Sequence, residues 1–230
     1  ASIQPTGERG LILRMRDIDE ETHQEILQRL GNSLEEKRFE SIGPVIGKEL
    51  KEKTKIFTIL VLIAIIFYIA FAFKKATKPI SSWQYGLVAA LVAFFHDLLI
   101  PLGIFALLGK FYDVQITIPI IVGLLTILGY SVHDTIVVFD RIRENISKRV
   151  ALTFEEIVNN SLNQTLARSI NTSLTALLVL IAIFFFGGET LKYFSLILIL
   201  GISLGTYSSI FIASPVLVSW YGLKQKKRKD

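Results

Sequence analysis

Apolar residues gather along this chain in five long runs, separated by short charged connectors and preceded by a mixed polar stretch over residues 1–55. A run of about 20 apolar residues is long enough to cross a membrane as a helix. The pattern predicts an α-helical polytopic membrane protein with a small α+β domain at its N-terminus. We expect a domain over residues 1–55, a transmembrane helix bundle over 56–221 and a basic tail over 222–230. The predicted spans cover residues 56–73, 83–109, 114–139, about 168–186 and about 191–221.

The first 55 residues predict a β-α-β unit. Residues 11–15 form a short apolar strand candidate, and residues 37–42 form a second one. Between them, residues 17–30 carry a helical apolar stripe that Asp17 or Asp19 would cap. The Gly31–Asn32 pair is expected to end this helix.

Lysine and arginine residues follow the first, third and fifth apolar runs, whereas the other two connectors carry little positive charge. The positive-inside rule therefore places the basic connectors and the C-terminus in the cytoplasm, and the N-terminal domain outside it. No apolar segment precedes residue 1 to export that domain, so six spans are expected in the full protein. The net charge of +5 is accounted for by topology and does not indicate binding of nucleic acid.

The residue types restrict the chemistry. The sequence has no cysteine, which excludes disulfides and thiolate chemistry. Its three histidines, His23, His96 and His133, are far apart and do not have metal-ligand spacing. No phosphate-binding loop or nucleophile motif is found either. We therefore expect neither an enzyme nor a metal site.

The strongest candidate for function lies in the run GYSVHDTIVVFDRIREN, residues 129–145, where His133 and Asp134 interrupt the third span. An acid buried in hydrocarbon costs at least ~2.5 kcal/mol, which makes it a functional candidate by default. Ser131 would lie on the same helix face, one turn before Asp134. The alternative is a pair at the end of the span that reaches the lipid headgroups. We favour a proton-responsive role.

A second ionisable pair, His96 and Asp97, lies near the middle of the second span. Two interpretations remain open, a proton site and a polar clamp that holds helices together.

Arg168 stands where the fourth apolar run begins, within the polar stretch 159–175. Asn160, Gln164 and Thr172 would share its helix face, because they recur at intervals of four residues. The first half of this stretch is compatible with an amphipathic helix on the cytoplasmic surface. A buried guanidinium needs a carboxylate or carbonyl partner, and Asp134 is the expected one.

Glycines mark candidate helix contacts, because small residues let backbones approach closely in lipid. Gly123 and Gly129 are expected at the closest contact of the third span. Gly201 and Gly205 form a GxxxG motif in the fifth span, which we interpret as packing only.

Four runs resemble the SecD/SecF family of protein-export membrane proteins. They are SIGPVIGKEL, FFHDLLIPLGIFALLG, LGYSVHDTIVVFDRIREN and NNSLNQTLARSINTSLTALLVLIAIFFFGG, in this order from about residue 40 to the C-terminus. In that family the acid of the DTIVVFDR run and the arginine of the TLAR run are implicated in proton conduction, and they match Asp134 and Arg168. His133 departs from the family, which usually has asparagine there.

The resemblance implies a member of the RND superfamily in a bacterial or archaeal cytoplasmic membrane. It implies an accessory subunit of the Sec protein translocase that uses the proton motive force, with the proton as coupling ion and no other cofactor. The implied partners are SecD, the SecY-E-G channel, SecA or YidC, the unfolded exported polypeptide and the lipid bilayer.

Two other functions remain as alternatives. A proton-driven exporter of lipids or hydrophobic small molecules would carry large porter domains, and residues 1–55 are short for one. A non-catalytic scaffold would predict that Asp134→Asn leaves export intact.

Overall fold

The computed structural model describes residues 2–6, 10–15, 18–31, 35–39, 44–74 and 80–226. The chain divides into two compact units, Ala1–Ile56 and Phe57–Asp230. The second unit contains most of the apolar sequence and holds both buried acids.

In the first unit, strand β1 (Ser2–Thr6) pairs antiparallel with strand β2 (Gly10–Arg14), and helix α1 (Glu20–Leu30) follows. The Asp19 carboxylate caps α1 by accepting a hydrogen bond from the Thr22 backbone N–H at 3.0 Å. Gly31 ends the helix at φ 77°, a conformation that favours glycine. The predicted helix and the Asp19 cap are confirmed, while the alternative cap, Asp17, lies outside the described residues.

The described elements run β-β-α, which differs from the predicted β-α-β order in that part of the chain. Strand β1 was missed, since its five residues include Pro5 and show no apolar alternation. The described part of the predicted second strand, residues 37–39, has no regular structure, and residues 40–42 lie outside the described part of the chain. Instead, Phe39 stacks on His23 of α1 with ring centroids 3.8 Å apart. Side-chain packing on α1 thus replaces the expected backbone pairing.

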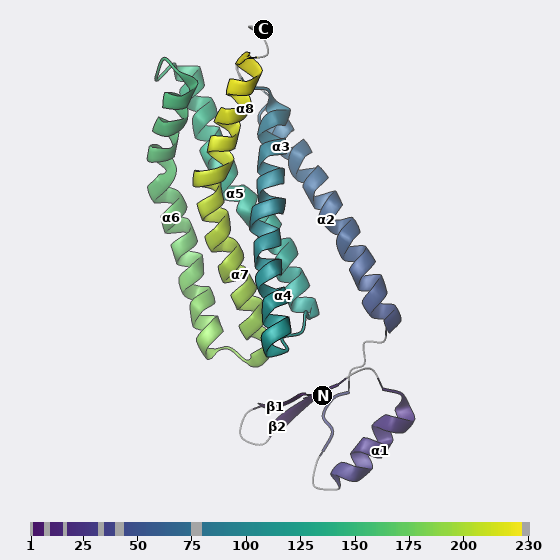
Figure 1. The fold of residues 1–230 in the computed structure, drawn as a ribbon. Coiled ribbons are helices and arrows are strands. Elements are labelled where there is room, and N and C mark those ends of the chain that lie inside the picture. Colours follow the sequence, from purple (N-terminus) through teal and green to yellow (C-terminus); the bar gives the residue numbers. More distant parts are fainter. Residues whose placement is uncertain are drawn as a thin grey trace. The chain divides into compact units, whose positions relative to one another are not determined.

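Five helices of the described chain are long and apolar enough to cross a membrane, as predicted. Figure 1 shows α6, α7 and the α3–α4 pair running side by side, with α5 passing behind them. The second and fifth spans are each built from two α-helices joined by a π-helical segment, η1 or η2. The elements are α2 (Pro44–Ala72), α3 (Ser82–Val92), η1 (Ala93–Leu98), α4 (Leu99–Tyr112), α5 (Ile118–Lys148), α6 (Phe154–Phe186), α7 (Glu189–Ser208), η2 (Ser209–Ala213) and α8 (Ser214–Lys226).

Helix α6 begins well before the apolar run that predicted it. Thr153 and Glu156 form a capping box, in which the Thr153 hydroxyl accepts from the Glu156 N–H and the Glu156 carboxylate accepts from the Thr153 N–H, both at 3.3 Å. This motif satisfies two N–H groups that a helix start leaves free. The polar stretch before Arg168 is therefore the first half of one continuous helix.

The two π-helical segments lie just before prolines. Pro101 follows η1, and Pro215 follows η2. A proline has no N–H to give to the preceding turn, so the helix must adjust there. The Ser214 hydroxyl donates to the Ser209 carbonyl, five residues back, at 3.1 Å and so supports the wide turn at η2.

Helix α5 forms the centre of the second unit, packed against α3, η1, α6, α7 and η2. Its contact with α7 is built on glycines. A Cβ on Gly201 would lie 2.2 Å from the Ile127 side chain, and one on Gly123 would lie 2.6 Å from Ile197. A Cβ on Gly205 would lie 3.0 Å from Ser131. These three predicted helix contacts are confirmed.

Gly129 is a correction. A Cβ there would meet nothing within 4 Å, so this glycine does not mark a close helix contact. It lies on the exposed side of α5, while Leu128 beside it is fully buried. Helical rotation by about 100° per residue separates the two environments.

Candidate functional site

Asp134 lies near the middle of α5, and its side chain is buried, with 3% of the residue exposed. The buried face of α5 also carries Ile127, Ser131 and Val138, which follow one another at helical spacing. This face packs against α6 and α7. The acid is therefore held inside the helix bundle.

Two hydroxyl groups from two other spans bind the Asp134 carboxylate. Oδ2 of Asp134 accepts from Ser173 Oγ of α6 at 3.2 Å and from Thr206 Oγ1 of α7 at 3.1 Å. The two hydroxyl oxygens lie 2.5 Å apart. A hydroxyl can donate or accept, so this pair can serve both an ionised and a protonated carboxyl group. The site can thus change charge without exchanging its partners.

His133 is exposed on α5, although it is next to Asp134 in the sequence. Consecutive residues on a helix point about 100° apart, so His133 leaves the face that holds the acid. In the described part of the chain, no hydrogen bond or ion pair joins the two side chains, and the Asp134 carboxylate binds Ser173 and Thr206.

The predicted pair of Asp134 with Arg168 is wrong for this structure. Among the described residues, no carboxylate lies within salt-bridge distance of Arg168, which is exposed on α6. The buried stripe of α6 instead carries four small hydroxyl residues spaced four apart. Arg168 directly precedes one of them, so it points about 100° away from the acid's neighbours. The stripe consists of Ser161, Thr165, Ser169 and Ser173.

Asp97 forms a second buried cluster. It lies in η1 with no exposed surface. Its Oδ2 accepts from Ser208 Oγ at 2.8 Å and also from Ser131 Oγ, and its Oδ1 lies 2.7 Å from His96 Nδ1. Ser131, expected near Asp134 on the shared face of α5, gives its hydroxyl to Asp97 instead.

Apart from Ser131, the hydroxyl partners of the two acids were not singled out from the sequence. Ser173, Thr206 and Ser208 stand in apolar runs, where serine and threonine are also common as plain packing residues. Their spacing along separate helices carries no signal of a shared partner. Only the packing of α5, α6 and α7 shows which hydroxyls meet which acid.

No metal centre is found among the described residues, where three or more histidine, aspartate or glutamate side chains nowhere gather in a suitable cluster. In the described chain, the hydrogen-bond partners of the Asp134 carboxylate are two hydroxyls, a set that suits a carboxyl group that gains and loses a proton.

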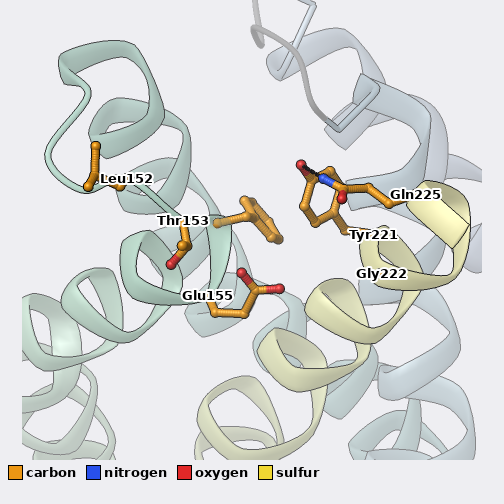
Figure 2. A pocket seen from close by; sticks show the side chains of 7 residues that line it. Leu152, Thr153, Glu155, Tyr221, Gly222 and Gln225 are labelled. Atoms are coloured by element: carbon orange, nitrogen blue, oxygen red, sulfur yellow. Dashed lines mark hydrogen bonds between the residues drawn. The ribbon is translucent and has the colours of Figure 1, made fainter. Parts of the chain in front are cut away.

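A shallow pocket lies between the start of α6 and the end of α8, lined by Leu152, Thr153, Glu155, Tyr221 and neighbours (Figure 2). Phe154 packs against Tyr221 there, with ring centroids 4.8 Å apart. Ser173, the α6 partner of Asp134, lies about 28 Å further along the helix at 1.5 Å per residue. The pocket is thus separate from the buried acids.

Comparison with known proteins points to one family. The family model described as protein export membrane protein SecD/SecF, C-terminal, matches residues 22–223. Protein translocase subunit SecF of Thermobaculum terrenum is 48% identical over 223 residues, which are 94% of this chain and 69% of the relative. The same subunit of Anaerolinea thermophila is 39% identical over 96% of this chain and 72% of its own length.

A solved structure agrees with the sequence matches. The crystal structure of SecDF from Thermus thermophilus, described as a translocon-associated membrane protein, superposes with a TM-score of 0.76 at 38% identity. The match covers 89% of this chain and 27% of the SecDF chain, so this chain corresponds to about a quarter of that protein.

Proposed function

This chain belongs to the SecD/SecF family of protein export membrane proteins, and we propose that it is an accessory subunit of a protein translocase that couples proton movement to polypeptide export. It is a multi-pass membrane protein with five spanning helices in the described chain. The proposal gives the chain no enzymatic step of its own and needs no cofactor beyond the coupling proton.

The observation that carries the proposal is Asp134, an acid buried mid-helix whose hydrogen-bond partners among the described residues are two hydroxyls. With the carboxylate ionised, both Ser173 and Thr206 donate to it. When a proton binds, the new carboxyl O–H becomes a donor, and one hydroxyl can turn to accept. One proton crossing ~150 mV releases roughly 3–4 kcal/mol, which can shift a two-state helix bundle. Proton binding at Asp134 would thus reverse one hydrogen bond between α5 and α6 or α7, which changes the strength of that helix contact while the partners stay the same.

The uncovered face of α6 supports a membrane partner. An apolar stretch of α6 is only 11% buried, against 50% for α5. Arg168, Asn171 and Thr175 are exposed on this helix at spacings of three and four residues, which places them on one face. A guanidinium facing lipid would be costly, so this face calls for a partner helix that supplies a carboxylate or carbonyl.

A SecD subunit is the partner we assign to this face, since the Thermus thermophilus relative carries the name SecDF. The family further suggests work beside the SecY-E-G channel, with SecA or YidC, on unfolded exported polypeptide. We place the N-terminal unit outside the cytoplasm and the C-terminus within it, on the distribution of lysine and arginine.

The test is the Asp134→Asn variant of the full-length protein together with its partners. Export into inverted membrane vesicles is measured with and without a proton gradient. We expect the variant to lose the gradient-stimulated part of export, because asparagine cannot bind and release the proton. Asp140→Asn is the matched control, since Asp140 is an exposed acid of the same helix that pairs with Arg143 at 2.7 Å. Full gradient stimulation in Asp134→Asn would favour a scaffold.

A further inference from the structure

The proposed proton site leaves Asp97 without a role, although it is more deeply buried than Asp134. Three hydrogen-bond partners from three spans surround its carboxyl group, namely the His96 ring nitrogen beside it and the hydroxyls of Ser131 of α5 and Ser208 of α7, which donate. A buried carboxylate accepts hydrogen bonds only, and here both oxygen atoms have partners. Asp97 therefore ties the second, third and fifth spans together at one point.

The bonds to Asp97 lie at or beside the π-helical turns of two spans. Asp97 is part of η1, and Ser208 is the last residue before η2. π-helical segments interrupt the regular hydrogen-bond ladder and occur frequently at functional sites. The bond from Ser208 to Asp97 therefore joins the two irregular turns directly, and fixes how residues before η2 are oriented.

Three consecutive residues of α7 each contact Asp134, His96 or Asp97. Thr206 donates to Asp134 at 3.1 Å, the Tyr207 ring lies against His96 with centroids 5.9 Å apart, and Ser208 donates to Asp97 at 2.8 Å. On α5, Ser131 binds Asp97 and stands one turn before Asp134. The two acids are thus held by the same two short segments, 131–134 and 206–208.

Backbone contact makes these segments move together. Gly205 lies against Ser131 so closely that a Cβ would come within 3.0 Å of it. Rotating α7 enough to release Ser208 from Asp97 would also carry Thr206 away from Asp134, since the two are less than one turn apart.

We propose that Asp97 is a positioning residue for Asp134, which holds the 206–208 segment so that the Thr206 hydroxyl faces the proton-binding carboxyl. This inference rests on the proposed proton function of Asp134. The groups that face Asp97 are His96 on its own segment, Ser131 on α5 and Ser208 on α7, and His96 in turn faces Tyr207. In this role the shape and acceptors of the Asp97 side chain matter, and its capacity to bind a proton does not.

The experiment follows Asp134 itself. Infrared difference spectra of the full-length protein with its partner in liposomes are recorded against pH, and the carboxyl band lost in Asp134→Asn reports its protonation. Ser208→Ala and Asp97→Ala should move the midpoint of this band by about half to one pH unit, the size expected when one hydrogen bond is misplaced. Asp97→Asn, which keeps the shape and an acceptor oxygen, should leave the midpoint and gradient-driven export close to wild type.

Ser195→Ala is the matched control, because Ser195 is a fully buried serine of α7 that donates to the Lys192 carbonyl of its own helix. It should leave the Asp134 midpoint unchanged. Loss of gradient-driven export in Asp97→Asn with an unchanged Asp134 band would make Asp97 a proton carrier and overturn the inference. An unmoved midpoint in Ser208→Ala would overturn it as well, and that variant removes one hydroxyl without the folding risk of Asp97→Ala. Retained gradient stimulation in Asp134→Asn would instead defeat the proposed function.

Discussion

Asp97 and Asp134 are both buried acids in the same helix bundle, yet their partners differ in number and kind. Asp97 has two serine hydroxyls and a histidine ring nitrogen on its two oxygens. Asp134 has two hydroxyls on a single oxygen, and these also contact each other. Both oxygens of Asp97 already have partners, whereas all hydrogen bonds of Asp134 among the described residues fall on Oδ2, which leaves Oδ1 to take a proton.

Burial alone therefore does not identify a proton site. Asp97 is the more buried of the two, with 0% exposed against 3% for Asp134. What separates them is how many carboxyl oxygens already have partners among the described residues, two in Asp97 and one in Asp134. The free carboxyl oxygen is therefore the feature that distinguishes the proposed proton-binding acid from the structural one in this bundle.

The largest loss of stability and of gradient-driven export is expected from a change at the glycine contact between α5 and α7. Gly201→Val would drive a side chain into Ile127, where even a Cβ lies 2.2 Å away. Overpacking of this kind costs about 1–3 kcal/mol, and it should disturb both acids together. The measurement is thermal unfolding in detergent, combined with gradient-driven export.

Gly129→Val is its control, because nothing lies within 4 Å of a Cβ at that position. It should unfold close to wild type. Equal destabilisation by the two valines would mean that α5 and α7 do not pack through Gly201.

A smaller effect on export is expected from a variant that changes the partners of Asp134 but not those of Asp97. Thr206→Val removes one of the two hydroxyls of Asp134 with little change in volume, and it leaves the Asp97 partners in place. Losing one hydrogen bond of this kind is worth about 0.5–1.5 kcal/mol, so gradient-driven export should fall roughly two- to tenfold. Thr206→Ser should restore it.

The matched change for that experiment is Thr126→Val in α5, an exposed threonine whose hydroxyl donates only to the Val122 carbonyl at 2.8 Å. Export should be unaffected by it. A null effect of Thr206→Val would show that Ser173 alone is sufficient for Asp134.

A double-mutant cycle on Asp134 and Arg168 should give a still smaller value, which is the coupling free energy between the two side chains. Their side chains belong to different faces, one buried and one exposed, so their effects on unfolding should add to within about 0.3–0.5 kcal/mol. The free energies of unfolding of Asp134→Asn, Arg168→Ala and the double variant would be compared in the same detergent. A coupling above about 1 kcal/mol would restore the direct pair that the sequence suggested.

The sequence predicted the features that depend on local pattern. Five spans were found because apolar runs of this length are typical of helices that cross a membrane, and Asp134 and Asp97 were found because acids in such runs are rare. The Asp19 cap was found because its chemistry is local to one helix start.

What the sequence could not supply was the rotation of each helix about its axis. That rotation places Arg168 and Gly129 on exposed faces. It places Ser173 and Gly201 on faces that contact other helices. Because each residue turns a helix by about 100°, an error of one residue in the rotation moves a side chain from one face to the other. The start of α6 carried a readable signal, since Thr153 and Glu156 stand at capping-box spacing. Strand β1 carried almost none.

The smallest predicted effect concerns a third carboxylate, Asp19. It is exposed, unlike the two buried acids, and it caps a helix. Hydrogen bonds from the Thr22 side chain and then from its backbone N–H lower the pKa of Asp19 from its ordinary value. A lowered folded-state pKa means that the cap stabilises α1 above the unfolded pKa, and that this is lost as the pH falls through the folded value. Amide hydrogen exchange in the first turn of α1, corrected for intrinsic rates, should therefore speed up toward about pH 3.

Asp19→Asn tests whether the carboxylate is responsible, because asparagine caps a helix as well as aspartate and does not titrate. Its first turn should keep its protection at acid pH, whereas Asp19→Ala should lose protection at every pH. Glu20 is the neighbouring group that could mimic the effect, since hydrogen bonds from Gln24 and then His23 lower its pKa too. Glu20→Gln should leave the acid-induced loss largely in place. If it removes that loss and Asp19→Asn does not, the pH response belongs to Glu20, and the exposed cap contributes through its geometry alone.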